Sequence, residues 1–174
     1  MEITTMEGFI NYYQKTRLVT KKVIGVIPPD QLDWTYKRGK FTIGDLVRHI
    51  AAIERHVFAE VALNNPPNYK GCGKELADGL SNILAYLDEM HAQSIAIFRS
   101  LPDASLKRKI RSLDGKEIGL DAFLRALLVH EIHHRGVLCI YLNLLGMETP
   151  PVLGLKEEEV KRLSRNQNET TGLC

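Results

Sequence analysis

Apolar residues recur at steps of three and four positions through most of the chain, a spacing that predicts amphipathic helices. Breaks rich in proline and glycine divide this pattern into long segments. The predicted helices cover residues 6–27, 43–65, 76–98 and 121–145. Because no long segment alternates strictly between apolar and polar residues, no central sheet is expected and the predicted fold class is all-α.

Helix ends are marked by residues with known terminal preferences. Pro28-Pro29 stops the first helix, and Pro66-Pro67 follows the second. Thr42 lies three residues before Asp45, which suits the N-cap of the second helix. Gly146 follows the last apolar position of the fourth helix and suits its C-cap. These boundaries predict a four-helix bundle.

Two shorter features complete the predicted fold. Apolar residues flank Asp114-Gly115, a dipeptide favoured in hairpin turns, so a small two-stranded β-ribbon is expected before the fourth helix. Residues 155–164 predict a last polar helix, and residues 166–174 are expected to be a frayed tail. The bundle is therefore predicted as one domain over residues 1–165.

Composition agrees with one domain, because 174 residues with 44% hydrophobic and 25% charged side chains suffice for a sizeable core. The 23 basic and 21 acidic residues give a formal net charge of +2. This excess is too small to build the basic surface that nucleic-acid binding uses, so no DNA or RNA partner is expected.

The cysteines and the hydropathy predict a cytoplasmic protein. Cys72, Cys139 and Cys174 are an odd number, and the sequence begins without a cationic segment followed by an apolar run. Charged residues interrupt every hydrophobic segment before it reaches the roughly 18 residues that a membrane helix needs. We therefore expect reduced thiols and no membrane segment.

Histidine is the residue type whose positions point to chemistry. Three of the six histidines, His130, His133 and His134, fall within five residues of the fourth predicted helix. His130 and His134 are one turn apart on the same face, so both imidazoles can reach one divalent metal ion. His49 is the natural third ligand, because it lies among the apolar positions of the second helix. Three imidazoles suit zinc or nickel and leave a coordination position open.

The other histidines fit a shared site less well. His133 points about 100° away from His134 around the helix and is interpreted as an outer or surface residue. His56 lies about 10 Å further along the second helix than His49, which favours a packed or rim position. His91 is expected in solvent or between helices. Whether His133 or His56 contributes to the site stays open at this point.

A competing pattern overlaps the same residues. Residues 130–134 satisfy H-E-x-x-H, in which a metalloprotease uses the glutamate as general base for zinc-bound water. The glycine and third histidine of the longer form are absent, and the downstream glutamates lie in a polar tail beyond Pro150-Pro151. The helical context also argues against a protease, so the three-histidine site is preferred.

Charged residues near these histidines have simpler explanations than a role in the site. Glu54 and Glu131 are candidates to orient ligand imidazoles, but a polar helix side is the preferred explanation for both. Arg135 is a candidate to bind a cofactor carboxylate, but a surface or interface ion pair is preferred. Gly136 indicates close helix packing or a need for room near the site.

Two motifs in this sequence resemble the DinB/YfiT-like metalloenzyme family. The first is LVHEIHHRG at residues 128–136, followed by YLNLLG at residues 141–146. The second is LDW at residues 32–34 with GKFTIGDL at residues 39–46, followed by His49. Both occur in the family's order and cover the middle and the C-terminal third of the chain.

The resemblance implies a four-helix bundle with a long crossover connection and frequent homodimers. It also implies a metal site of three histidines, which map onto His49, His130 and His134. One departure is Val137, where the family often carries glutamine, so a polar role at that position is not expected here.

Family members of established activity are similar to thiol-dependent transferases that use bacillithiol, mycothiol or glutathione. We therefore expect a metal-dependent thiol S-transferase acting on a small molecule, with a low-molecular-weight thiol as cosubstrate. A bound metal would lower the pKa of a thiol, ordinarily near 8.5, so that the thiolate forms at neutral pH. A metal-dependent hydrolase of a small substrate and a non-catalytic dimeric stress-response protein are the alternatives.

Overall fold

The computed structural model describes residues 2–37, 41–151 and 154–171, with side chains described as far as Arg165. The long helices are α1 (Met6–Ile24), α2 (Ile43–Ile53), α4 (Leu80–Ser100), α5 (Leu120–Leu144) and α6 (Glu157–Thr171). A π-helical segment (Glu54–Ala59) and the short helix α3 (Glu60–Ala62) continue α2. The strands are β1 (Lys109–Arg111) and β2 (Glu117–Gly119), and short 3₁₀ turns cover Pro29–Gln31 and Asp103–Lys107.

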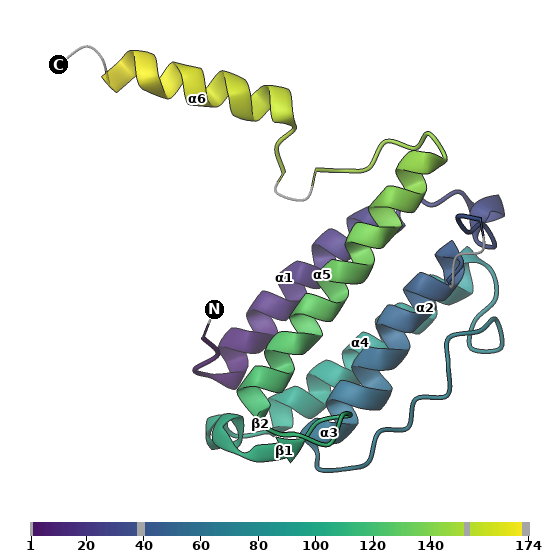
Figure 1. Cartoon of the computed structure of the whole chain (residues 1–174), viewed down its shortest axis with the longest axis vertical. Coiled ribbons are helices and arrows are strands. Elements are labelled where there is room, and N and C mark those ends of the chain that lie inside the picture. Colours follow the sequence, from purple (N-terminus) through teal and green to yellow (C-terminus); the bar gives the residue numbers. More distant parts are fainter. Residues whose placement is uncertain (1, 38–40, 152–153, 172–174) are drawn as a thin grey trace.

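The four helices α1, α2, α4 and α5 form a bundle in which α1 and α5 run in one direction and α2 and α4 in the other (Figure 1). The parallel course of α2 and α4 shows in their contacts, because Glu54 bonds to His91 and Arg55 to Gln93. Residues 63–79 carry the chain back along the length of the bundle between them (Figure 1). The predicted all-α bundle with a long crossover is confirmed.

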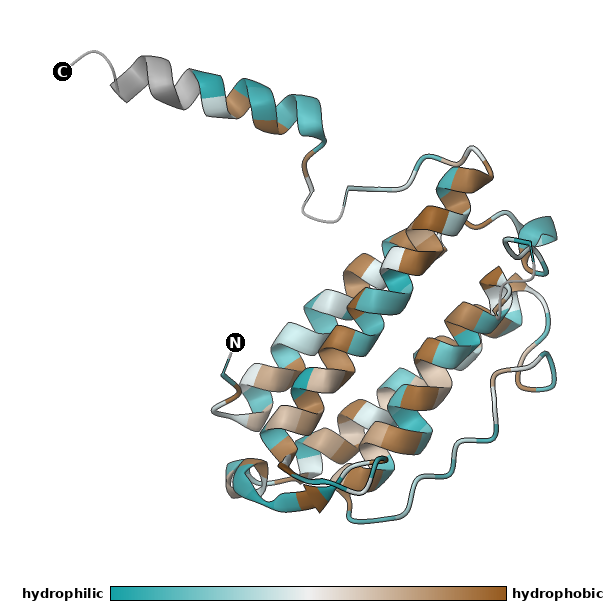
Figure 2. Ribbon diagram, viewed as in Figure 1, coloured by the Kyte–Doolittle hydropathy of each residue, from teal (hydrophilic) through white to brown (hydrophobic). Residues whose placement is uncertain are grey.

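The interior consists of two apolar clusters with a polar layer between them. One cluster joins the start of α1 to the ends of α2 and α4 and the start of α5, and the other joins the opposite ends of these helices. Figure 2 shows apolar residues distributed over the bundle helices, whereas α6 is mainly hydrophilic and projects away from the bundle. The buried polar side chains between the clusters are Thr16, Arg17, Thr20, Glu54, Ser94, Glu131 and Arg135.

Local sequence signals account for the ends of the two helices that carry the candidate site. Thr42 caps α2 through a reciprocal pair of bonds with Asp45, each 3.0 Å long. Burial alone would raise the pKa of Asp45, but the bond from Thr42 N–H and the contact with the Arg48 guanidinium lower it below its usual value. Gly146 ends α5 with φ of 76°, and Met147 N–H donates to the Leu142 carbonyl at 2.9 Å.

The β-ribbon is present as predicted. β1 and β2 pair antiparallel with Ile110 opposite Ile118, and Gly115 takes a φ of 83° in the turn between them. Ile110 is buried in the core cluster at the start of α5, and the partly buried Ile118 packs against the same cluster.

Several boundaries and faces differ from the sequence-based expectations. α4 begins at Leu80 rather than at residue 76, after a turn around Gly79. Leu18 and Ile140 are apolar residues of α1 and α5, but their side chains are 60% and 58% exposed. Leu18 follows the buried Tyr13 by five positions, which turns it about 140° away from that face.

The C-terminal segment is longer than predicted. α6 extends from Glu157 to Thr171 where the sequence pattern indicated a helix over residues 155–164 and a frayed tail from residue 166. Residues 172–174 lie outside the described residues. Among the described helices, none combines the length and the apolar character that crossing a bilayer requires.

Candidate metal centre

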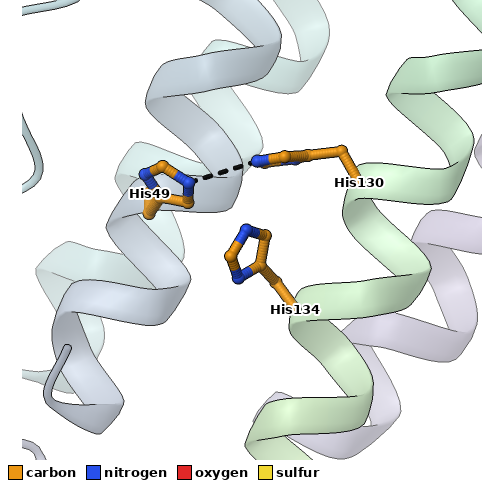
Figure 3. Close-up of side chains that lie close together, drawn as sticks. All are labelled: His49, His130 and His134. Atoms are coloured by element: carbon orange, nitrogen blue, oxygen red, sulfur yellow. Dashed lines mark hydrogen bonds between the residues drawn. The ribbon is translucent and has the colours of Figure 1, made fainter. Parts of the chain in front are cut away.

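Three histidines from two helices meet at one point of the bundle. His49 extends from α2 and His130 and His134 from α5, with a ring nitrogen of each directed into the space between them (Figure 3). His49 Nε2 lies 3.1 Å from His130 Nε2, and the candidate ligand atoms of all three residues lie within 4.8 Å of one another.

This geometry fits a divalent metal. Two imidazole nitrogens bound to one tetrahedral zinc ion at about 2.0–2.1 Å are separated by about 3.3 Å, close to the 3.1 Å between His49 and His130. The ring centroids of His130 and His134 are 4.4 Å apart, as expected for side chains one turn apart on a helix. The described residues contain no other such group of three histidine, cysteine or acidic side chains.

The structure keeps the paired imidazoles of α5 neutral. Burial, together with the positive charges that neighbouring histidines would carry, lowers the pKa of His130 to about 3. Burial and the same neighbours lower the pKa of His134 to about 4. Both rings are therefore uncharged at neutral pH, which is the form that binds metal.

Tyr69 from the crossover contacts the third imidazole. Its hydroxyl lies 2.9 Å from His49 Nδ1, so this ring nitrogen is occupied and Nε2 is left to face His130. Burial and a hydrogen bond with the Cys72 thiol raise the pKa of Tyr69, which keeps the hydroxyl protonated. A histidine ligand typically has such a partner, which orients its ring.

Aromatic rings surround the imidazoles. The Phe41 ring centroid is 4.9 Å from that of His49 and 6.1 Å from that of His134. The Phe58 centroid lies 6.2 Å from that of His130. These apolar neighbours contribute to the desolvation that keeps His130 and His134 neutral.

The remaining histidines lie elsewhere, and neither His133 nor His56 belongs to the group of three. His133 is exposed beside His134, as interpreted from its position on the helix. His56 is half-buried in the π-helical segment, and its carbonyl accepts a bond from Asn68 N–H. His91 lies between helices, where Nδ1 is 2.8 Å from Glu54 Oε1.

The preferred explanation of Glu54, Glu131 and Arg135 was wrong. Both glutamates are fully buried, and each contacts Arg17 of α1, at 2.6 Å for Glu54 and 2.9 Å for Glu131. Arg135 is buried as well, and its Nη1 donates to the Thr16 carbonyl. None of the three faces solvent, because their partners on α1 lie inside the bundle.

The position of Glu131 also removes the basis for a metalloprotease. In the H-E-x-x-H mechanism the glutamate must face the metal to act as general base. Here Glu131 accepts a bond from Thr20 Oγ1 at 2.7 Å and contacts Arg17, on the α1 side of the helix. The pattern is present in the sequence, but the base is committed to another contact.

No packing contact among the described residues requires glycine at position 136. A Cβ atom added there would meet no atom of the described residues outside its own helical turn within 4 Å, so neither close packing nor space for the site requires glycine.

Sequence reasoning also missed Arg17 and Tyr69. Arg17 lies within the apolar stripe of α1, which was an available signal, whereas nothing in the sequence pattern indicated that Tyr69 would contact His49.

Comparison with known proteins identifies related chains. The model of the DinB superfamily matches residues 12–138. YfiT of Bacillus subtilis (strain 168), described as a probable metal-dependent hydrolase, is 30% identical over 140 residues, which cover 74% of this chain and 79% of YfiT. YjoA of the same strain is 27% identical over 140 residues, which cover 79% of this chain and 88% of YjoA.

Solved structures share the fold. A DinB-like protein from Bacillus cereus matches with a TM-score of 0.69 and 18% identity, over 85% of this chain and 97% of that protein. The YfiT structure matches with a TM-score of 0.65 and 22% identity, over 82% of this chain and 89% of that chain. It is described as having an unusual four-helix bundle topology.

Replacing Tyr69 by phenylalanine tests its contact with His49. The Tyr69→Phe variant keeps the ring but loses the bond to Nδ1, so we expect affinity for Zn²⁺ to fall about 10-fold. Competition with a chromophoric chelator measures this affinity. Tyr12→Phe, on the exposed side of α1, is the control and should bind as the unaltered protein does. Equal affinity in all three proteins would show that the contact does not orient the ligand.

Proposed function

This chain belongs to the DinB superfamily, and on that basis we propose that it is a metal-dependent enzyme whose ion is held by His49, His130 and His134. The observation that carries the proposal is the convergence of three imidazole nitrogens within 4.8 Å. Zinc and nickel are the proposed ions, because both accept neutral imidazole nitrogen. Three protein ligands leave room for a substrate.

Within this class we propose a thiol S-transferase. When bound, the ion would lower the pKa of a coordinating thiol or water, which is the chemistry that either reaction needs. A thiol near pKa 8.5 requires a much smaller shift than water near 15.7 to ionise at neutral pH. The engagement of Glu131 with Arg17 and Thr20 supports the thiol, because this glutamate is not available to take a proton from water.

Hydrolysis of a small substrate is the second candidate. The observation in its favour is the relationship to YfiT, which is described as a probable metal-dependent hydrolase. The same three imidazoles would hold the ion in either reaction, so the nucleophile distinguishes the two. For both, the proposed substrate is a small molecule with an electrophilic carbon. We place the enzyme in the cytoplasm, and the free thiols of Cys72 and Cys139 support a reducing compartment.

We also propose that the protein is a homodimer that associates through the outer face of α5. Four large apolar side chains are exposed on this helix, and they are Val129, Ile132, Ile140 and Leu144. They follow one another at steps of three, eight and four, with Gly136 between them. A stripe of this kind is costly in solvent and typical of an interface. The open space around Gly136 would allow a partner helix to approach closely.

Metal content tests the site. Protein prepared without an affinity tag should contain about one divalent ion per chain, and His134→Ala should lose most of it because only two of the three imidazoles remain. Elemental analysis measures both. His133→Ala is the matched control, since this neighbouring imidazole is exposed and outside the group, and it should retain the metal. Equal metal content in the His134→Ala and unaltered proteins would reject the proposed ligand set.

The reaction class is tested with a panel of low-molecular-weight thiols and an electrophile such as monochlorobimane. We expect thioether formation that requires both the metal and one of the thiols, and that falls at least about 100-fold in His134→Ala. His133→Ala should react normally. Metal-dependent hydrolysis without any thiol would favour the second candidate, and no turnover of either kind would favour a non-catalytic role.

The dimer is tested by changing the outer face of α5. Light scattering should give twice the chain mass for the unaltered protein, and Ile140→Glu should shift the mass toward that of one chain by placing a charge in the interface. Leu113→Glu is the control, because this residue is 68% exposed on the β-ribbon. A monomeric unaltered protein, or a dimer that survives Ile140→Glu, contradicts this interface.

A further inference from the structure

One guanidinium contacts both helices that carry the candidate ligands. Arg17 Nη2 lies 2.6 Å from Glu54 Oε2 and 2.9 Å from Glu131 Oε2. Arg17 is 3% exposed and both carboxylates are completely buried. Arg17 itself belongs to α1, which contributes no histidine to the site.

The two carboxylates are close in sequence to the histidines. Glu131 directly follows His130 on α5, and Glu54 begins the π-helical segment five positions after His49. A glutamate and a histidine at adjacent helical positions point about 100° apart. On α5, Glu131 therefore contacts α1 while His130 and His134 contact the α2 side. A rotation or shift of the helix would move both contacts together.

The free-energy cost of burying two carboxylates restricts where the helices that carry them can lie. A buried carboxylate without a partner is strongly unfavourable, so both glutamates must stay within reach of the same guanidinium. These contacts restrict the distance between the π-helical segment and α5 at the height of Arg17. Apolar side chains on either side of the polar layer exclude water that could replace the contact.

A metal site also requires that its ligand-bearing helices keep a fixed spacing and rotation. Ligand nitrogens must lie about 2.0–2.1 Å from the ion, and a preorganised site avoids the cost of moving two helices when the ion binds. The separation of 3.1 Å between His49 Nε2 and His130 Nε2 occurs where the Arg17 contacts hold the two helices together.

We propose that Arg17, through Glu54 and Glu131, is a positioning residue that sets the spacing and rotation of the two ligand-bearing helices and so prepares the three-histidine site for its ion. This inference rests on the proposed metal site. It assigns no contact between Arg17 and the ion or the substrate. Thr20, which donates to Glu131, and His91, which bonds to Glu54, support the same two carboxylates.

Two variants test the inference. Arg17→Met removes the guanidinium but leaves two buried carboxylates, so this variant can lose the fold. The triple variant Arg17→Met, Glu54→Gln, Glu131→Gln removes all three charges and keeps the side-chain sizes, so it is expected to fold. Leu106→Ala is the stability control, because Leu106 is a core residue beside the β-ribbon and away from the histidines.

The measurement is Co²⁺ binding to the metal-free proteins, followed by visible absorption below the unfolding temperature of each. We expect the triple variant to bind Co²⁺ at least about 10-fold more weakly than the unaltered protein and to give an altered absorption spectrum at saturation. The spectrum reports ligand geometry, which a simple loss of stability does not change. Leu106→Ala should unfold at a lower temperature but keep the affinity and the spectrum.

Two results would overturn the inference. One is a folded triple variant with unaltered affinity and spectrum, and the other is a Leu106→Ala protein with the same change in affinity and spectrum as the triple variant. Each leaves the proposed metal site intact, because the unaltered protein still binds Co²⁺. If the unaltered protein itself binds no Co²⁺, the proposed function fails, and the positioning role fails with it.

Discussion

A positive charge inside the bundle restricts the packing of three helices at once. Removing a guanidinium from water costs on the order of several kcal/mol, and close carboxylates offset part of that cost. Arg17 donates a hydrogen bond to Glu54, from the segment that continues α2, and forms an ion pair with Glu131 of α5. The apolar clusters on either side add stability without specifying rotation, since apolar contact is not directional. The ion pairs therefore contribute the directional part of the packing.

This requirement explains the unusual distribution of side chains on α5. At residues 130–135 the helix directs His130 and His134 toward α2 and its charged residues, Glu131 and Arg135, toward α1. With two inner faces occupied by polar groups, apolar residues such as Val129 and Ile132 lie on the outer face. The polar inner faces of α5 at residues 130–135 thus account for both the interior position of the histidine site and the apolar outer face of the helix. The proposed dimer would cover that exterior.

The helices and the histidine cluster could be predicted because the information is local. Capping at Thr42, the glycine at the end of α5 and the one-turn spacing of His130 and His134 each depend on a few neighbouring residues. The burial of Glu54 could not be predicted in this way, because its partner Arg17 is 37 positions away. Without that partner, solvent exposure is the favourable state for a carboxylate. One local signal of this contact is present in the sequence, because the charged Arg17 interrupts the apolar stripe of α1.

The crossover has a chemical consequence that follows from topology alone. Because α2 and α4 are parallel, the chain must return along the full length of the bundle before α4 can begin (Figure 1). That return brings Tyr69 to His49, and Arg48 holds the same segment through bonds to the carbonyls of Cys72 and Ala77. An antiparallel hairpin between the two helices would need only a short loop and would leave His49 Nδ1 without this hydroxyl. The long connection therefore supplies part of the surroundings of the site as well as joining the helices.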